Sequence, residues 1–171
     1  MFASFLICVV LSSVANSPDG LSAFSDGPLR ITGKQLVTSI IKPEKTESLA
    51  SCWKCQADGT TALNFGDISA TADGMTLTQI DRERYAFMLS GNCVLRMRGL
   101  SATATKISWS MDDRPMILSG NAQITVVIDG KPTTVVGETI TFDHTDNTLK
   151  LPDGITKRLP SSKIYALEVP R

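Results

Sequence analysis

Three of the four cysteines and the one histidine are the side chains of this sequence best suited to chemistry, because Cys8 lies in the apolar run of residues 1–15 that we expect to be cleaved. Cys52 and Cys55 form the stretch CWKC, Cys93 follows the stretch LSGN, and His144 is the only histidine. Two cysteines separated by two residues are typical of thiol redox sites and of zinc sites. Together with His144, the three cysteines would supply the four ligands of a tetrahedral zinc ion, provided that a local knuckle turned their sulfurs toward one another.

The surroundings of these residues favour a structural role. CWKC does not open a helix, where the pKa of a thiol would be lowered, and Gln56 stands where a haem-attachment motif has histidine. On a strand, Cys52 and Cys55 would point to opposite faces of the sheet. His144 lies within FDHTDNT, which is typical of a turn between strands. We therefore predict a protein that is not an enzyme and that has no cofactor and no metal site.

Residues 1–15 have most features of an export signal. They contain the uncharged apolar run FLICVVL and then the small-residue pattern Ser13-Val14-Ala15, although no positive charge precedes the run. We expect cleavage there and a mature protein that is periplasmic or secreted. Because cysteines pair in oxidising compartments, we also expect one disulfide among Cys52, Cys55 and Cys93, with one free thiol.

The overall composition is that of one soluble globular domain. The chain has 171 residues, of which 42% are hydrophobic and 20% charged, and its formal net charge is zero. A nucleic-acid-binding protein usually carries a basic surface that neutralises phosphates. The mixed charges therefore predict no nucleic-acid partner.

Alternating apolar and polar residues predict an all-β fold. Cys93, Leu95 and Met97 alternate with polar or outward positions, and residues 122–128 show the same period of two. Dipeptides such as Gly-Asn and Asp-Gly punctuate these runs, as expected between strands.

The sequence also repeats itself. Leu-Ser-Gly-Asn occurs at residues 89–92 and 118–121, and each copy follows a related segment, ISATADGMTLT or LSATATKISWS. A period of about 30 to 40 residues indicates two-strand units that stack on one another. We expect Ser-Gly-Asn to form the tight turn between the strands of a unit, with Gly or Asn at positive φ, and we expect Gly59 to be equivalent to Gly99.

These motifs resemble a known family. PLRITGKQL, the two LSGN stretches with the alternating strands after them, SATATKISWS and GETITFDHTDNTLKL are similar to the OstA-like (organic solvent tolerance N-terminal) domain of LptA-type periplasmic lipopolysaccharide-transport proteins. The resemblance covers residues 28–151 and leaves residues 152–171 as a C-terminal tail. The departures are the insertion SIIKPEKTESLASCWKC, the cysteines and the tail.

The resemblance implies a β-jellyroll or taco of stacked antiparallel strands with an open apolar seam. In that family the interior takes the acyl chains of lipopolysaccharide, and edge strands join neighbouring OstA-like envelope proteins. The residues expected to line the interior are Leu77, Phe87, Leu89, Leu95, Met97, Ile107, Trp109, Ile124, Val126, Ile140 and Phe142.

Two functions follow from this pattern. The first is non-catalytic binding or shuttling of lipid of the lipopolysaccharide type. The alternative is a structural β-repeat protein that assembles edge to edge without a ligand, because apolar strand faces more often form a closed core. We expect the tail, with Lys157, Arg158 and Pro160, to block the C-terminal edge and keep the protein monomeric, whereas residues 29–36 leave the other edge open.

Overall fold

The described residues form one large, open antiparallel sheet. The computed structural model describes residues 15–16, 20–41, 52–81, 84–97, 99–111, 115–128, 131–143, 146 and 148–158. Its strands are β1 (Ala15–Asn16), β2 (Ser22–Asp26), β3 (Leu29–Gly33), β4 (Gln35–Ile41), β5 (Cys52–Phe65), β6 (Ile68–Gln79), β7 (Tyr85–Met97), β8 (Leu100–Ser110), β9 (Met116–Ile128), β10 (Lys131–Asp143), β11 (Thr148–Lys150) and β12 (Thr156–Arg158). This part of the chain contains no helix long and apolar enough to span a membrane.

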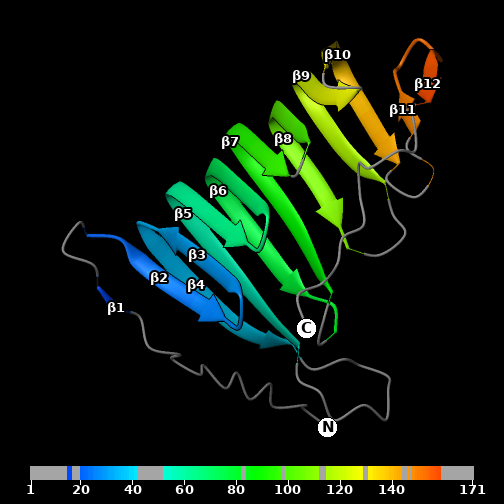
Figure 1. Ribbon diagram of the computed structural model, residues 1–171. Helices are drawn as coiled ribbons and strands as arrows, with labels where there is room; N and C mark the ends of the chain where they lie inside the picture. Colours follow the sequence, from blue (N-terminus) through cyan, green and yellow to red (C-terminus); the bar gives the residue numbers. More distant parts are fainter. Residues whose placement is uncertain are drawn as a thin grey trace, which may run out of the picture.

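Strand order follows chain order almost throughout, from β1 and β2 at one end to β12 at the other (Figure 1). The two end strands do not pair with each other, so the sheet stays open. The all-β taco expected from the sequence is confirmed. The sheet also extends past both expected limits, residues 28 and 151, because β2 and β12 belong to it.

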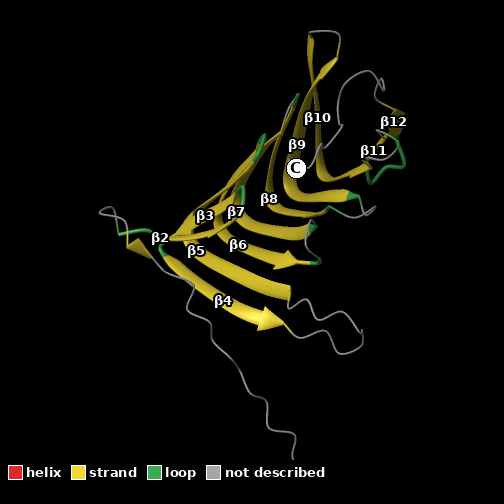
Figure 2. Cartoon of the chain, turned by 60° about the horizontal axis from the view of Figure 1, so that its bottom comes forward, coloured by secondary structure: helices red, strands yellow, loops and turns green. Residues whose placement is uncertain are grey.

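Each long strand bends near its middle, and the sheet folds back on itself (Figures 1 and 2). The pairing of each neighbouring pair from β5 to β10 shifts register at the same level, which we call the crease. The crease separates two arms. Arm 1 contains β4 and residues 52–58, 74–79, 85–90, 106–110, 116–119 and 139–143, and arm 2 contains β2, β3 and residues 61–65, 68–72, 93–97, 100–104, 122–128 and 131–137.

The repeated Gly-Asn dipeptide lies in this crease. Gly91 and Asn92 have φ values of 70° and 45°, and Gly120 and Asn121 have values of 77° and 50°. The expected positive φ is confirmed, but the expected tight turn is wrong, because β7 and β9 continue through these residues. Two successive residues in the left-handed region act as a bulge, which bends a strand without ending it.

We call each such pair of successive positive-φ residues in the crease a corner. Gly59 belongs to another corner. Gly59 and Thr60 have φ values of 72° and 50°, and they interrupt the pairing of β5 with β6. Gly59 is therefore equivalent to Gly91, and the expected match with Gly99 is wrong because Gly99 follows the end of β7. The sequence repeat corresponds to a structural repeat. Each unit is a pair of strands that contains one corner, and the two strands of a unit are joined outside the crease.

Side-chain hydrogen bonds join the strands along the crease, where ladder pairing is interrupted. Asn92 Nδ2 donates to Asp73 Oδ2 over 2.8 Å, and Thr105 Oγ1 donates to the carbonyl oxygen of Gly120 over 3.2 Å. The buried Thr61 Oγ1 donates to the carbonyl oxygen of Ala72 over 3.0 Å. The crease is thus a fixed line that positions the two arms.

The N-terminal edge differs from the one expected over residues 29–36. Gly33 and Lys34 divide this stretch, so β3 lies inside the sheet between β2 and β5. β4 turns into arm 1, where it pairs with β5 and leaves its other side open among the described strands. The exposed edge is QLVTSII, which carries no charge.

Candidate lipid-binding interior

The inner faces of both arms are apolar. In arm 1 one cross-strand row consists of Ala57, Met75, Leu89, Ile107, Leu118 and Ile140, and in arm 2 a corresponding row consists of Leu63, Ala70, Leu95, Ala102, Ile124 and Val135. Facing sheets pack about 10 Å apart, which lets side chains from the two arms meet.

All of the residues predicted to line the interior lie on these inner faces. The most exposed of them, Met97, is only 9% exposed, and Leu77, Ile124, Val126 and Ile140 are fully buried. Their inward direction, which the alternation of the sequence predicted, is confirmed. Their role in lipid binding stays a prediction.

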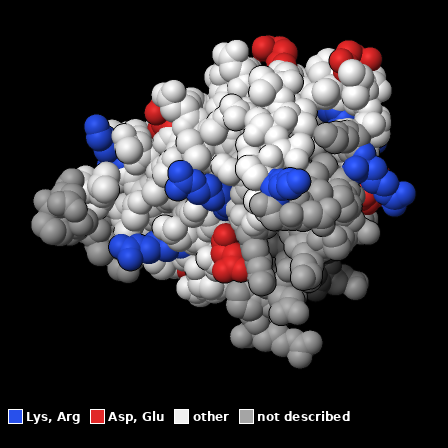
Figure 3. Space-filling model, turned by 45° about the horizontal axis from the view of Figure 1, so that its top comes forward, with Lys and Arg blue, Asp and Glu red and all other residues white. Residues whose placement is uncertain are grey.

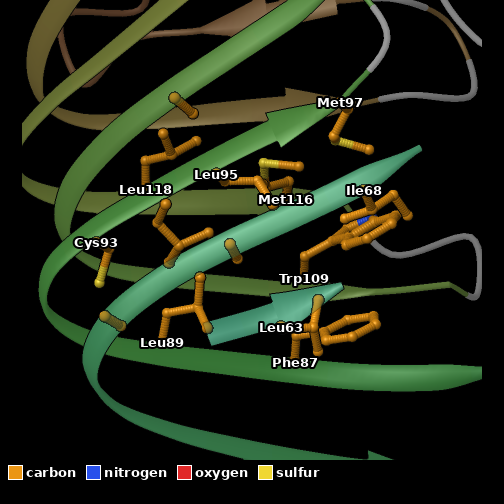
Figure 4. Close-up of a cluster of buried hydrophobic side chains, with 14 of the residues drawn as sticks. Leu63, Ile68, Phe87, Leu89, Cys93, Leu95, Met97, Trp109, Met116 and Leu118 are labelled. Atoms are coloured by element: carbon orange, nitrogen blue, oxygen red, sulfur yellow. The ribbon is translucent and has the colours of Figure 1, made fainter. Parts of the chain in front are cut away.

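A small cavity lies between the arms, and Figure 4 shows several of the buried apolar side chains that surround it. Its volume is about 10 Å³, and its lining consists of Leu63, Ile68, Ala70 and Leu95 from arm 2 and Phe87, Leu89, Ile107 and Trp109 from arm 1. A space of this size holds about one water molecule. The described side chains around this cavity are therefore closely packed.

The sequence predicted five of the lining residues and missed Leu63, Ile68 and Ala70. Leu63 and Phe65 alternate up to the turn at Gly66, and Ile68 and Ala70 continue the alternation after it. This alternation with a period of two is the sequence signal that could have identified the three missed residues. The six other predicted residues pack in the core outside the cavity lining.

Trp109 is the one lining residue whose side chain carries a polar atom. Its ring stacks on Phe87 with a centroid separation of 5.2 Å and an interplanar angle of 11°. Its side chain is 3% exposed, and its buried Nε1 atom has no hydrogen-bond partner among the described residues. Figure 4 shows Trp109 and Phe87 on the inner side of the sheet, near Leu63 and Ile68. Nε1 is therefore a buried donor that does not reach the surface of the cavity, which is entirely apolar.

A cluster of aromatic residues joins the outer ends of the two arms, at the side away from the crease. Phe24 of arm 2 packs on Trp53 of arm 1 with ring centroids 4.6 Å apart, and Phe65 of arm 2 packs on Tyr85 of arm 1 at 5.5 Å. Trp53 Nε1 also donates to Asp26 Oδ2 over 3.0 Å. We call Phe24, Asp26, Trp53, Phe65 and Tyr85 the aromatic latch. No pattern in the sequence indicates it.

Tyr85 is held in its neutral form within the latch. Burial raises the pKa of the Tyr85 hydroxyl, and the negative charge of Asp26 and a hydrogen bond with Asp26 raise it further. A neutral hydroxyl is what a carboxylate acceptor requires as a donor. Asp26 therefore interacts with two residues of the opposite arm.

The described cysteines are free thiols. Cys55 and Cys93 are both buried and unpaired. Every pair among Cys52, Cys55 and Cys93 includes one of these two, so the expected disulfide is absent. The reason is placement: Cys55 lies in arm 1 on β5, Cys93 follows the corner of β7, and β6 runs between them. Two strand spacings amount to about 9.5 Å, which exceeds the reach of a disulfide.

Burial also lowers the reactivity of these thiols. It raises the pKa of Cys55 to about 11 and raises that of Cys93 as well. A thiol acts as a nucleophile or metal ligand in its ionised form, which such a pKa disfavours at neutral pH. The Cys52 side chain and His144, the other members of the zinc alternative, lie outside the residues whose side chains are described.

Outside the interior, charged side chains are scattered. On the face seen in Figure 3, isolated Lys and Arg side chains and isolated Asp and Glu side chains are separated by uncharged surface. Large aliphatic side chains are also exposed on the outer sheet surface, among them Val37, Met88, Val127 and Val136.

No protein-family model matches this chain, and no curated protein matches it significantly. The resemblance to the OstA-like domain therefore rests on the short motifs quoted above and on the all-β taco that it implies.

Proposed function

We propose that this protein binds or shuttles lipid acyl chains, of the lipopolysaccharide type, in the interior between its two arms, without catalysis. The observation that supports this most is the continuous apolar face that each arm turns toward the other in a sheet that is not closed. Transfer of an acyl chain from water to such a face is favourable by about 0.8 kcal/mol for each methylene buried.

An acyl chain requires more room than the cavity offers in the described state. The cavity holds about 10 Å³, so the arms must separate when a chain enters. The crease is joined by the hydrogen bonds of Thr61, Asn92 and Thr105, whereas the aromatic latch joins the outer ends of β2, β5 and β7. Separation of the arms at their outer ends, with the crease intact, would expose the interior.

Filling the cavity tests the proposal. Ala70 lines the cavity, and its neighbour Thr71 points outward on the same strand. We expect Ala70→Leu to reduce extraction of a pyrene-labelled acyl lipid from phosphatidylethanolamine–phosphatidylglycerol vesicles by about tenfold, because added methylenes compete for the same space. Thr71→Leu should leave extraction unchanged.

The assay is read as loss of pyrene excimer emission from the vesicles. Urea unfolding of both variants establishes that each remains folded. Failure of the unmodified protein to extract lipid would contradict the proposal. Equal extraction by both variants would place the lipid outside this interior.

A second candidate is a structural repeat protein that assembles edge to edge. β4 favours it, because this uncharged strand pairs on one side only among the described strands, and Val37 on it is 64% exposed. Such an edge is a template for another strand. The close packing around the cavity is compatible with this function, which requires no ligand.

A further inference from the structure

The two arms end differently on the C-terminal side of the sheet. Among the described strands, arm 2 ends with β10, whereas arm 1 continues through β11 and β12 (Figure 1). Leu149 on β11 pairs with Phe142 on β10, and both side chains are only 1% exposed. Arm 1 therefore extends its apolar inner face past the last described strand of arm 2.

Leu151, directly after β11, lies on the inner side of the sheet at this end. Gly137 of arm 2 is opposite the fully buried Ala122, and opposite residues of paired strands lie on the same face. Leu151 Cδ2 lies 3.3 Å from the position that a Cβ atom on Gly137 would occupy, and Ile140 Cγ1 lies 3.7 Å from the same position. The Leu151 side chain thus extends from arm 1 to arm 2 next to the crease and covers the inner face of β10.

Leu151 also separates the interior from solvent at this end. Its side chain is half-buried and packs against the core, whereas Pro152, Asp153 and Gly154 are exposed and Ile155 is 56% exposed. A tight turn fixes its position, because Leu151 N donates to the carbonyl oxygen of Ile155 over 3.0 Å and Gly154 N donates to that of Leu151 over 3.1 Å.

We propose that Leu151 is the end stop of the interior and limits the length of the acyl chain that the interior accepts. This inference rests on the proposed lipid-binding function and adds a specificity-determining residue to it. The arm 1 row defined above crosses the strands and ends at Ile140. Since Lys150 pairs with Thr141, the next residue in line after Ile140 is Leu151. An acyl chain that lies along this row meets the Leu151 side chain.

The polar groups of the two ends indicate which end of the chain Leu151 meets. On the N-terminal side, the latch contains the carboxylate of Asp26 and the hydroxyl of Tyr85. The side chains of Ile140, Phe142 and Leu151 contain only carbon and hydrogen. A terminal methyl group needs no polar partner, whereas burial of a polar group without one is unfavourable. The methyl end of the chain therefore points toward Leu151.

A series of saturated fatty acids tests this proposal. Equilibrium dialysis of radiolabelled acids with about 10 to 18 carbons measures how affinity depends on chain length. In the unmodified protein, affinity should rise about fourfold for each added carbon until the methyl end reaches Leu151, and it should level off at longer chains. Leu151→Ala should move this limit to chains about two carbons longer, and it should bind them at least about fourfold more tightly than the unmodified protein does.

Leu151→Phe tests the opposite direction, because a larger end stop should move the limit to shorter chains. Ile155→Ala is the matched control, since Ile155 lies in the same turn and is exposed, and it should keep the limit of the unmodified protein. Urea unfolding establishes that each variant is folded. If Leu151→Ala does not fold, the shorter limit expected for Leu151→Phe decides alone.

The outcomes separate this inference from the function on which it rests. One limiting length shared by the unmodified protein and both Leu151 variants would overturn the role of Leu151 while leaving lipid binding intact. An affinity that keeps rising over the whole series in the unmodified protein would do the same. Absence of binding of every fatty acid to the unmodified protein would overturn the proposed function together with this inference.

Discussion

Trp53 and Asp26 form a hydrogen bond of 3.0 Å between the outer ends of the two arms, although β3 and β4 separate them in the chain. Together with the ring contacts of Phe24 and Phe65, it connects the arms on the side opposite the crease. Like the hydrogen bond between Tyr85 and Asp26, it is a polar side-chain link of the latch, and it provides a direct way to alter how readily the arms separate.

Asp26→Ala should lower the free energy of unfolding by about 1 to 3 kcal/mol, because it leaves the Trp53 donor without a partner. The same change should cost less in a Trp53→Phe background, where that donor is already gone. Urea unfolding of the two single variants and the double variant measures this coupling. An equal cost of Asp26→Ala in both backgrounds would show that the hydrogen bond contributes nothing.

Stability should fall at alkaline pH because of Cys55. The unfolded chain ionises this thiol near its ordinary pKa of 9.0, and the folded chain does so only near about 11. Between these values only the unfolded state gains from ionisation, so the unfolding free energy is unaffected below pH 9 and decreases above it.

The decrease should reach about 2 kcal/mol by pH 11, and Tyr85, whose pKa is also raised, adds to it above its ordinary pKa of 10.0. Urea unfolding at pH 8, 9, 10 and 11, compared with Cys55→Ala, isolates the contribution of the thiol. A variant that loses as much stability as the unmodified protein over this range would exclude Cys55 as the cause.

Gly120→Ala should destabilise the protein more than Gly99→Ala. Both glycines have positive φ, 77° and 75°. A Cβ atom on Gly120 would lie 2.7 Å from Thr105 Oγ1 and 2.8 Å from Thr105 Cβ, whereas one on Gly99 would meet no atom within 4 Å. Gly99→Ala therefore measures the backbone strain alone, about 1 kcal/mol.

We expect Gly120→Ala to cost at least about 1 kcal/mol more than that, because Thr105 has to move away from the crease. Thermal unfolding of the two variants provides the comparison. If both variants lose the same stability, the crease tolerates displacement of Thr105 and is less fixed than its hydrogen bonds indicate.

The two edges of the sheet should differ in how readily they pair with a strand of another molecule. β12 pairs with β11, and Pro152 and Gly154 lie in the connection between them. Truncation after Leu151 removes β12 and leaves the edge of β11 open next to the open edge of β10, so we expect concentration-dependent oligomers at micromolar protein, where the full chain stays monomeric. Truncation after Arg158 keeps β12 and is the matched control.

Sedimentation velocity of the full chain and of the two truncated proteins measures their oligomeric states. Val37→Lys in the truncated protein should suppress the oligomers, because a charge on the β4 edge disfavours strand addition. Oligomers that form equally in the full chain would show that β12 does not protect its edge. Oligomers that persist with Val37→Lys would exclude β4 as the partner strand.

The alternation of the sequence predicted which residues face the interior, because side-chain direction in a strand is a local property with a period of two. Leu89, Leu95 and Ile107 are examples. The function of the Gly-Asn stretches was not predictable in the same way. Positive φ serves a hairpin and a mid-strand corner equally well, and only the pairing of β7 with both neighbours decides between them.

Contacts between the arms do not follow from the local pattern of the sequence. The pairing of Trp53 with Asp26 depends on the fold of the sheet at Gly59 and on the turn of the chain from β3 to β4, which together bring two outer ends face to face. The absence of a disulfide has a similar origin: the disulfide was expected because residues 1–15 indicate export to an oxidising compartment, whereas the separation of Cys55 and Cys93 across β6 is a matter of topology.

The corners at Gly59, Gly91 and Gly120 are aligned along the crease, one for each pair of strands. Such a sheet is modular in length. Insertion of one more copy of a corner-bearing strand pair would lengthen the trough by about 9.5 Å without changing its cross-section, and deletion of one would shorten it equally. Chain duplication can thus change the number of units, which sets the length of the interior between the arms.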